Sequence, residues 1–351
     1  EYAWWKCTKN SDHPSYKTKI ARKVYNYTGC PYCVGQKVSK SNSLLFLFPK
    51  IAKELHPTKN KKKASELTGK SGEICFWNCT NNKNHKPYPS TVYNRTISKA
   101  DKWVEEYKGS MAKTPGEASQ NSEIVFMCVG RDEDIIEVME GEGGILSNVA
   151  EGSIIVDHTT ASAEIARNYY QKLKDKKLSF LDAPVSGGQA GAENGVLSIM
   201  IGGDEKDYNT VKPVLTSYGK AVELIGPSGS GQIAKMINQI CIAGLVQGLS
   251  EAMAFGKKSN VDMEKVLSVI SKGAAQSWQM ENRYRTMIDG KFDYGFAVDW
   301  MRKDLSICFN EADKNGAILP ITKIVDKYYE EVQKNGGNRF DTSSLMTLVD
   351  K

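Results

Sequence analysis

Histidine, long apolar runs and, near the start of the chain, acidic side chains are all scarce in this sequence. Only 4 of its 351 residues are histidine. No apolar run approaches the roughly 20 residues that a membrane-spanning helix needs. The opening residues EYAWWKC have neither an initiator methionine nor a signal-peptide pattern. We therefore expect no membrane partner, a cytoplasmic location and a recorded sequence that begins inside a longer reading frame.

Charge is unevenly distributed along the chain. Residues 1–90 contain seventeen Lys or Arg and five Asp or Glu, a net charge of +12, whereas the whole chain carries +6. Residues 91–351 therefore carry −6. A chain of this length also exceeds one ordinary hydrophobic core. We expect a basic segment joined to a mildly acidic remainder with more than one domain.

Five of the eight cysteines and three of the four histidines lie before residue 91. This segment repeats itself: Trp4–Tyr16 (WWKCTKNSDHPSY) is echoed by Phe76–Tyr88 (FWNCTNNKNHKPY), and a CPYC follows the first copy. Three thiolates and one imidazole suit tetrahedral Zn²⁺, and a CxxC presents two sulfurs to one ion. Free, buried thiols are the alternative. The predicted zinc ligands are Cys7, His13, Cys30 and Cys33.

This segment resembles the small treble-clef zinc-ribbon modules that occur as tandem arrays in bacterial proteins. The resemblance implies a binding role with nucleic acid as a partner, since lysines and interleaved aromatic side chains can contact phosphates and bases. The KNKKK run at 59–63 is equally explained as a solvated loop. The second copy has no CxxC, so Cys79 and His85 are expected to form a half-site that binds no zinc tightly.

From Thr91 onward, short apolar runs rich in branched residues alternate with amphipathic segments such as SKADKWVEEY. This alternation predicts an α/β fold with a largely parallel, doubly wound, Rossmann-like sheet. After Gly229 only helical patterns follow, which predicts an all-helical last third. The expected strands are 91–94, 124–129, 153–157, 178–182, 197–202 and 221–226.

One stretch, Gly229–Lys258, organises this last third. Its apolar residues wrap most of the way round at helical spacing, which predicts one long, buried helix. Lys235 and Asn238 interrupt the first turns, and their spacing of three places them on one face. Desolvating an ammonium group is costly, so a polar or anionic ligand is one explanation. A lysine whose amine reaches water is the other.

Five motifs follow one another in this region: DHTTAS (157–162), DAPVSGGQAGAENGVLSIMIGG (182–203), GQIAKMINQ (231–239), KDL (303–305) and DTSSLM (341–346). Together they resemble the β-hydroxyacid dehydrogenases, in particular 3-hydroxyisobutyrate dehydrogenase and the NADPH-dependent glyoxylate or succinic semialdehyde reductases. The resemblance extends from about Thr91 to the end of the chain. It implies hydride transfer between a nicotinamide and a small β-hydroxy acid or its aldehyde or keto partner.

The resemblance also implies roles for residues in these motifs. Lys235 would hydrogen-bond the reacting oxygen and carry the proton, and Asn238 would hold the substrate or Lys235 in line. A lysine suits this role because burial lowers its pKa toward the working pH. Ser186, Gly187 and Gly188 form a turn without bulky side chains, where backbone N–H groups can approach a substrate carboxylate. A plain strand-to-helix turn is the alternative.

A second set of residues matches family positions around the cofactor, although each alone could be an ordinary core or surface residue. The NRT turn (Asn94, Arg95 and Thr96) follows the first expected strand. An acid there would bind the ribose of NAD, whereas an arginine accommodates the extra phosphate of NADP. Arg95 favours NADP, with NAD possible and a surface arginine as the alternative. The positions that match cofactor contacts are Cys128, Val129, Thr160 and Lys303.

The family's GxGxxG turn, whose backbone amides bind the pyrophosphate, has no counterpart upstream of the TVYN strand. The one match in the chain, Gly229–Ala234 (GSGQIA), opens the helix that carries Lys235, and no strand with a terminal acid follows it. We expect it not to bind a dinucleotide.

The zinc-ribbon array and the dehydrogenase both break off between Pro89 and Thr91. One joining of two unrelated reading frames explains both losses.

These observations predict three parts and leave two functions open. The first function is an NADP-linked oxidoreductase that forms a homo-oligomer through its helical domain, and the intact Lys235 and Asn238 favour it. The second is a zinc-dependent nucleic-acid-binding module on an inactive dehydrogenase scaffold, and the missing pyrophosphate turn favours it. The parts are a zinc-ribbon segment at 1–90, an NADP-binding domain without its first βα unit at 91–228 and an all-helical domain at 229–351.

The missing first strand has a predictable consequence for the sheet. In the strand order 3-2-1-4-5-6, strand 1 lies between strands 2 and 4. Without it, the strands at 91–94 and 124–129 either remain about 9 to 10 Å apart or slide together and pair.

Overall fold

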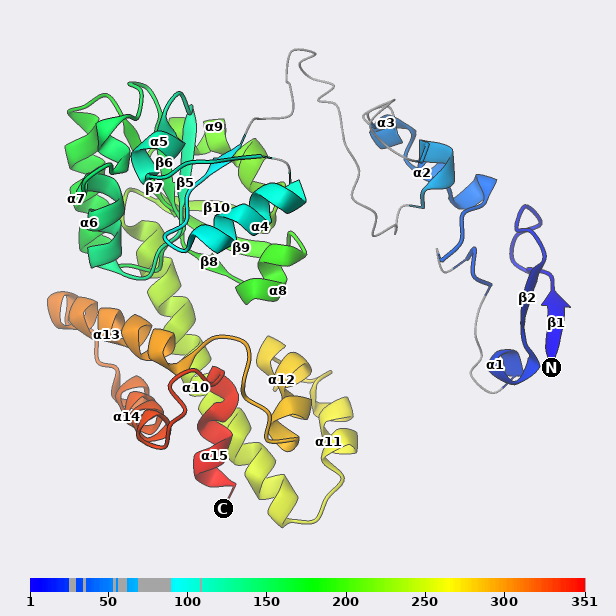
Figure 1. Ribbon diagram of the computed structural model, residues 1–351. Helices are drawn as coiled ribbons and strands as arrows, with labels where there is room; N and C mark the ends of the chain where they lie inside the picture. Colours follow the sequence, from blue (N-terminus) through cyan, green and yellow to red (C-terminus); the bar gives the residue numbers. More distant parts are fainter. Residues whose placement is uncertain are drawn as a thin grey trace. The chain divides into compact units, whose positions relative to one another are not determined.

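The computed structural model describes residues 1–24, 30–33, 36–52, 55, 62–68, 90–107 and 109–350. These residues divide into two compact units, and Figure 1 draws both. The first unit lies within Glu1–Ser90 and Trp103–Ser110, and the second comprises Thr91–Lys102 and Met111–Lys351. Each unit has a hydrophobic cluster of its own.

The first unit begins with a β-hairpin. Strand β1 (Tyr2–Trp5) pairs antiparallel with β2 (Tyr16–Lys19), and helix α1 (Ile20–Val24) follows. Cys7 and His13 lie in the loop between the two strands. A small buried cluster further along consists of Leu44, Ala52, Leu55 and Leu67. The short helical elements of this region are η1 (Lys40–Asn42), α2 (Leu44–Leu47), α3 (Pro49–Ala52) and η2 (Ala64–Glu66).

The second unit contains a six-stranded sheet in the order β10-β9-β7-β6-β5, with β8 paired to β9. Strands β5, β6 and β7 run parallel, and β10 runs parallel to β9. The Rossmann-like sheet is confirmed, but β9 is antiparallel to β7 and β8, a reversal that the apolar pattern cannot reveal. The strands are β5 (Ile124–Met127), β6 (Ile154–Asp157), β7 (Ser179–Asp182), β8 (Val185–Ser186), β9 (Leu197–Gly202) and β10 (Gly219–Gly226).

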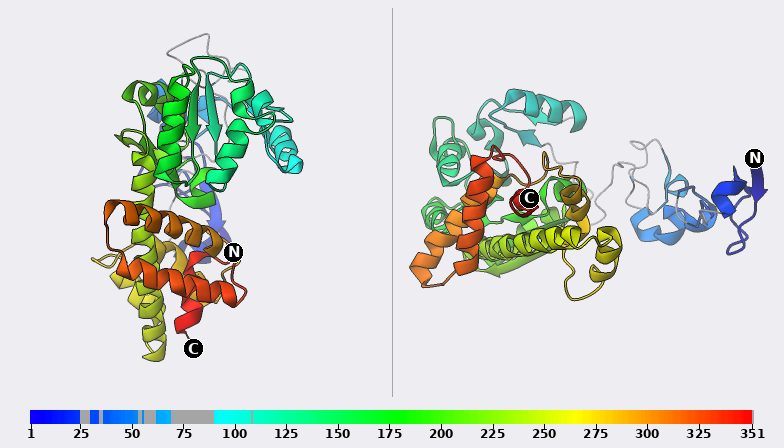
Figure 2. Two further views of the ribbon diagram at one scale, coloured as in Figure 1. Left: turned by 90° about the vertical axis from the view of Figure 1, so that its left-hand side faces the viewer. Right: turned by 90° about the horizontal axis from the view of Figure 1, so that it is seen from below.

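Helices cover both faces of this sheet, as Figure 2 shows from two further directions. Ile155 and Val156 are neighbours in β6, both are fully buried, and they belong to different clusters because side chains alternate along a strand. Ile155 packs toward α6 (Asp132–Glu140) and α7 (Ala163–Lys174), and Val156 packs toward α9 (Glu205–Leu215). The remaining helices here are α4 (Ile97–Tyr107), α5 (Pro115–Ser119), η3 (Ile145–Ser147) and α8 (Gly188–Glu193).

Two short strands stay apart from the main sheet. β3 (Thr91–Val92) and β4 (Ser110–Met111) pair with each other. Within the described part of the chain, β5 has β6 as its single strand neighbour, and Phe126 on β5 is 40% exposed. Of the two outcomes expected for a missing first strand, the direct pairing of β3 with β5 is absent among the described residues, because β3 pairs with β4 instead.

The last third is helical, as expected, and is built around α10 (Ser230–Lys258), the yellow-green helix that leaves the sheet in Figure 1. Ala243 and Val246 of α10 belong to one buried cluster, and Leu249 and Met253 belong to a second. The elements packed around it are α11 (Met263–Ile270), α12 (Trp278–Ile288), α13 (Val298–Asn315), α14 (Pro320–Lys334), η4 (Thr342–Leu345) and α15 (Met346–Val349).

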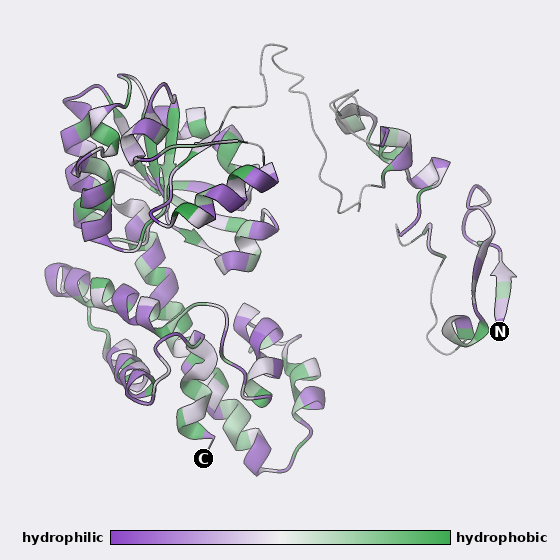
Figure 3. Cartoon of the chain, in the orientation of Figure 1, coloured by the Kyte–Doolittle hydropathy of each residue, from purple (hydrophilic) through white to green (hydrophobic). Residues whose placement is uncertain are grey.

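The expectation that this helix is buried on nearly every face is wrong. Ile237 is 58% exposed, Leu245 39% and Phe255 75%, because apolar spacing does not say how many faces neighbouring helices cover. Polar and apolar segments alternate along the helix in Figure 3. By length and mean hydropathy alone, α10 would suffice to cross a membrane, and no other helix among the described residues would. The expectation that no apolar run reaches that length is therefore corrected for α10.

Candidate active site

Lys235 lies in the second turn of α10 and is only 7% exposed. Its side chain takes part in no hydrogen bond or ion pair with any residue that the structure describes. Burial lowers the pKa of the Lys235 amine; nearby Asp304 opposes this shift and nearby Lys303 adds to it. Lys235 is therefore a buried amine whose donors have no protein acceptor.

A polar chain begins one turn further along α10. The Asn238 amide donates to Gln239 Oε1 at 2.8 Å, and Gln239 Nε2 donates to Asp304 Oδ2 on α13 at 2.6 Å. Burial raises the pKa of the Asp304 carboxyl, while Lys303 and Lys235 act in the opposite direction. Asn238, predicted from the sequence, is thus held indirectly by a buried carboxylate. Gln239 and Asp304 were quoted inside the motifs, but no role was predicted for either.

Lys303 joins α13 to the loop that follows β6. Its Nζ donates to the Thr160 carbonyl oxygen at 2.5 Å and lies 2.8 Å from Asp304 Oδ1. The structure therefore brings together Lys303 and Thr160, two of the predicted cofactor contacts, and the charge of Lys303 is close enough to lower the pKa of Lys235.

A buried glutamine, Gln232, fastens the start of α10 to the same loop. Its Nε2 donates to the Thr159 carbonyl at 2.7 Å, and its Oε1 accepts from the Ala161 N–H at 3.0 Å. The Thr159 hydroxyl in turn accepts from the Val129 N–H at 2.9 Å. The predicted contacts Val129 and Thr160 are thereby held in one network with α10. Sequence reasoning missed Gln232 and Thr159, although both stand beside quoted residues.

The Ser186–Gly188 turn connects β8 to α8. Gly187 has φ +132° and Gly188 has φ +61°, values that favour glycine. A Cβ on Gly187 would lie 3.1 Å from a methyl group of Leu197, so the turn is also tightly packed. No hydrogen bond joins this turn to Lys235 in the described part of the chain. The turn has the strand-to-helix form of the plain alternative. Ser186 pairs with Ser198 in the β8–β9 ladder, whereas the N–H groups of Gly187 and Gly188 have no acceptor among the described residues.

The NRT turn lies at the start of α4, away from this network. Asn94 Oδ1 accepts from the Thr96 N–H at 2.9 Å. The Arg95 side chain is 81% exposed and reaches Asp134 Oδ1 of α6 at 4.0 Å. Asp134 Oδ2 also accepts from the Gly130 N–H at 3.1 Å. Among the described residues, the Arg95–Asp134 ion pair is the side-chain contact that connects this turn to α6. The exposed Cys128 lies in the β5–α6 loop that leads into α6.

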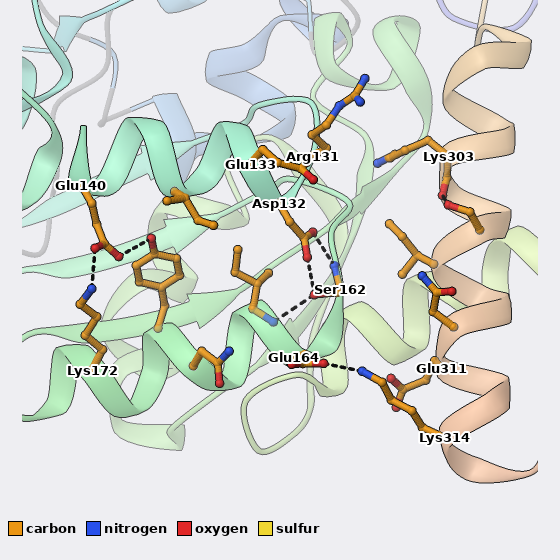
Figure 4. A pocket seen from close by; sticks show the side chains of 17 residues that line it. Arg131, Asp132, Glu133, Glu140, Ser162, Glu164, Lys172, Lys303, Glu311 and Lys314 are labelled. Atoms are coloured by element: carbon orange, nitrogen blue, oxygen red, sulfur yellow. Dashed lines mark hydrogen bonds and ion pairs between the residues drawn. The ribbon is translucent and has the colours of Figure 1, made fainter. Parts of the chain in front are cut away.

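A cavity of about 690 Å³ lies beside the network, between α6, α7 and α13. Figure 4 shows charged side chains of both signs around it. Asp132 accepts from the N–H and the hydroxyl of Ser162, at 2.9 and 2.5 Å, and Lys314 pairs with Glu164 across the mouth. Lys303 is the one predicted site residue that lines it. Lys172 pairs with Glu140 and Lys314 with Glu164, whereas the lining residues Arg131 and Glu133 have no ion pair with any described residue.

In the first unit, four predicted metal ligands converge. The Cys7 and Cys33 sulfurs are 3.5 Å apart, and His13 Nδ1 lies 3.6 Å from the Cys30 sulfur and 3.4 Å from the Cys33 sulfur. All four ligand atoms lie within 4.8 Å of one another. Such a set could hold a metal ion. Cys79 and His85 lie outside the described residues.

Known proteins resemble the chain from the end of the first segment onward. Residues 77–226 match the family described as the NAD binding domain of 6-phosphogluconate dehydrogenase, and residues 229–349 match "NAD-binding of NADP-dependent 3-hydroxyisobutyrate dehydrogenase". An uncharacterized oxidoreductase of Shewanella frigidimarina is 57% identical over 74% of this chain and 90% of that protein. The chain belongs to the 3-hydroxyisobutyrate dehydrogenase family. Another member, the 2-hydroxy-3-oxopropionate reductase of Escherichia coli, is 33% identical over 68% of this chain and 82% of that protein.

Solved structures of this family have the same fold. The 3-hydroxyisobutyrate dehydrogenase from Salmonella typhimurium superposes with a TM-score of 0.66 at 25% identity, covering 74% of this chain and 90% of that one. The complex of Psf3 with NADP⁺ and 2-OPP gives a TM-score of 0.69 at 21% identity, covering 74% and 92%. By family, the protein is an NAD(P)-dependent oxidoreductase, and small hydroxy acids are the family's substrates.

Proposed function

We propose that this member of the 3-hydroxyisobutyrate dehydrogenase family interconverts a small β-hydroxy acid and its aldehyde or keto partner, with Lys235 as the proton carrier. The observation that carries the proposal is the buried Lys235 amine, which has no polar partner among the described residues. A buried cation without a partner is costly, so a bound substrate oxygen supplies the missing acceptor. Two relatives fit this class by name, the 2-hydroxy-3-oxopropionate reductase of Escherichia coli and the 2-(hydroxymethyl)glutarate dehydrogenase of Eubacterium barkeri.

When bound, a nicotinamide supplies or accepts the hydride. In the reducing direction, the N–H groups of Gly187 and Gly188 and the hydroxyl of Ser186 hold the substrate carboxylate, and the Lys235 ammonium donates a hydrogen bond to the carbonyl oxygen. As the carbonyl carbon gains the hydride, that oxygen takes a proton from Lys235 and becomes a hydroxyl. The neutral amine then regains a proton from solvent. Burial lowers the pKa of Lys235, which makes its proton easier to transfer than that of an exposed lysine.

NADP is the proposed cofactor, with NAD possible, and the described residues fit one end of it. The Lys303 amine donates to the Thr160 carbonyl, the Val129 N–H donates to the hydroxyl of the adjacent Thr159, and the charge of Lys303 lies near Lys235; this supports the nicotinamide end here. Arg95, 81% exposed at a strand end, is free to meet a ribose phosphate. The pyrophosphate end does not fit: β5 lies at the edge of the main sheet, and no glycine-rich turn comes before β3 in the sequence.

This mismatch supports the proposal that the dehydrogenase lacks its first βα unit and follows a foreign segment. The match to the Shewanella relative covers 261 residues and 90% of that protein, which leaves a tenth of its length unmatched. We place the fused protein in the cytoplasm. The exposed apolar residues Ile318 (88%), Ile321 (61%) and Phe255 (75%) support a homo-oligomer through the helical domain.

The function is tested by exchanging Lys235 for alanine. Turnover of small β-hydroxy acids by Lys235→Ala should fall by about 100-fold or more, because no other buried amine can pass the proton. Lys258→Ala, at the exposed end of the same helix, is the matched control and should keep parental turnover. Circular dichroism checks that both variants fold. Turnover by Lys235→Ala within tenfold of the parent would remove Lys235 from this role.

A second function is favoured by the cysteine and histidine cluster: zinc binding, with nucleic acid as the partner and the dehydrogenase as a scaffold. Sulfurs at 2.3 Å and a nitrogen at about 2.0 Å from one tetrahedral Zn²⁺ would stand about 3.5 to 3.8 Å apart. The Cys7–Cys33 sulfur separation and the distances from His13 Nδ1 to the Cys30 and Cys33 sulfurs, 3.4 to 3.6 Å, are close to those values. We expect one zinc per chain, lost in Cys33→Ser and retained in Cys79→Ser. Two zincs per chain by elemental analysis would contradict the proposal, and loss of nucleic-acid binding with chelator would support it.

A further inference from the structure

Asp182 ends strand β7, is completely buried and lies directly under the first turn of α10. Its Oδ1 accepts from the Gly229 N–H at 2.7 Å, and its Oδ2 accepts from the Gln232 N–H at 3.0 Å. The Ser228 hydroxyl lies at 3.5 Å from Oδ1. Asp182 has no ion pair with any described residue, so these helix-start donors are what stabilises its charge.

Glycines make room for this carboxylate. A Cβ on Gly202 would lie 2.6 Å from Asp182 Oδ1, and a Cβ on Gly231 would lie 2.9 Å from Oδ2 and 2.5 Å from the Met200 carbonyl oxygen. Gly229 has φ +90°, a conformation that other residues rarely adopt. The glycines of the GSGQIA sequence therefore allow α10 to approach the end of β7 closely.

We infer that Asp182 is a positioning residue for Lys235: its carboxylate occupies the anion site at the start of α10 and fixes where that helix begins. First-turn amides of a helix ordinarily bind an external anion such as a phosphate. Here the anion belongs to the same chain, which leaves no room for a dinucleotide at GSGQIA. Lys235 follows Gly229 by six residues on one continuous helix. The position and rotation of α10 that Asp182 fixes therefore also determine where the Lys235 amine lies.

Burial raises the pKa of the Asp182 carboxyl to about 6, and the Gly229 and Gln232 amides work against that rise. Above that pH the carboxylate is ionised and accepts from both amides. In Asp182→Asn, the side-chain NH₂ must face one of these backbone donors. The hydrogen bond from that backbone N–H is then lost, and the backbone N–H and the side-chain NH₂ face each other as two donors.

The inference rests on the proposed role of Lys235, but its first test measures amide hydrogen exchange and does not require enzyme activity. In the full chain, amide hydrogen exchange at Gly229 and Gln232 should be at least about 10-fold slower than at Ile321, which lies in the first turn of α14 where no side chain caps the helix. In Asp182→Asn the two amides should exchange about 10- to 100-fold faster, and Ile321 should not change. Equal exchange in parent and variant would overturn the inference.

The second test separates positioning from general stability. In chains that turn over substrate, Asp182→Asn should lower kcat by about 10- to 100-fold and leave KM within about threefold, because the carboxylate-binding turn at 186–188 is built on other elements. A rise in KM with unchanged kcat would overturn the inference. Loss of turnover in Lys235→Ala without any effect of Asp182→Asn on kcat would retain the proposed function and reject this inference alone.

A glycine pair in α10 supplies a control that does not alter charge. Gly231→Ala should lower the melting temperature by about 4 °C or more, since its methyl group meets Asp182 and a carbonyl oxygen. Gly244→Ala, on the same helix with nothing within 4 Å of the added Cβ, should keep or raise it, because alanine favours a helix. Equal effects of the two substitutions would contradict the close approach on which the inference depends.

Discussion

The two ends of the active site differ in how they are held. Around Lys235, side chains of α10 and α13 bind one another and the backbone of the β6–α7 loop through hydrogen bonds of 2.5 to 3.0 Å. Around Arg95, one ion pair of 4.0 Å joins an exposed side chain to α6, and the two-stranded β3–β4 sheet stands apart from the main one. If the proposed function is correct, the residues around Lys235 keep their geometry, whereas the proposed adenosine end at Arg95 has little support from neighbouring side chains.

The largest effect should come from restoring that support. We expect the chain as it stands to bind NADPH at millimolar concentration or not detectably, because two or three charge-assisted hydrogen bonds to the pyrophosphate are missing. A chimera in which the first βα unit of the Shewanella relative replaces residues 1–90 should bind about 10³- to 10⁶-fold more tightly. Calorimetric titration measures both. Micromolar binding of NADPH by the parent chain would show that its pyrophosphate site is intact and would remove the contrast between the two ends of the site.

A smaller effect should distinguish the two nicotinamide cofactors. In the same chimera, Arg95→Ala should weaken NADPH binding by about 10- to 100-fold and leave NADH binding unchanged, since the guanidinium meets the additional phosphate. Arg285→Ala, which removes an exposed arginine of α12, is the control. Equal losses for both cofactors, or none for either, would remove Arg95 from the cofactor site.

A third effect concerns the pH dependence of stability at the well-supported end. Burial raises the pKa of Asp157 to about 7 from an ordinary 3.8, while hydrogen bonds from Thr159 oppose the rise. The fold thus favours the protonated carboxyl, so its contribution is complete below about pH 4 and is lost as pH rises through 7. The difference corresponds to at most about 4 kcal/mol. Urea unfolding between pH 4.5 and 8 should show this decline, flattened in Asp157→Asn but not in Asp175→Asn.

The sequence predicted the parts of the molecule whose pattern is local. Strands β5, β6, β7 and β9 were located to within about two residues because branched apolar runs between turns are typical of buried strands. The start and end of α10 were also predicted. The direction of β9 was not, since the same side-chain alternation serves parallel and antiparallel neighbours.

The sequence predicted the residues that stand out in a motif or in an apolar helix and missed the buried partners that hold them. Lys235 stood out because a cation in an apolar helix needs an explanation. Gln232 and Gln239 did not, because an amide in a helix has no such cost until its burial is known. Asp182 was quoted in a motif, but its partners lie 47 and 50 residues further along the chain. Contacts at that separation depend on how the sheet and helix come together, which no local pattern contains.

The open edge of β5 also bears on solubility. The Glu123 and Met127 carbonyls accept from β6, so in a parallel ladder the backbone groups of Ile124 and Phe126 point away from the sheet. An apolar edge of this kind is a template on which another extended chain can add a strand. The amount of protein that stays dispersed after synthesis therefore depends on its concentration, and a short peptide able to pair with β5 would keep more of it in solution.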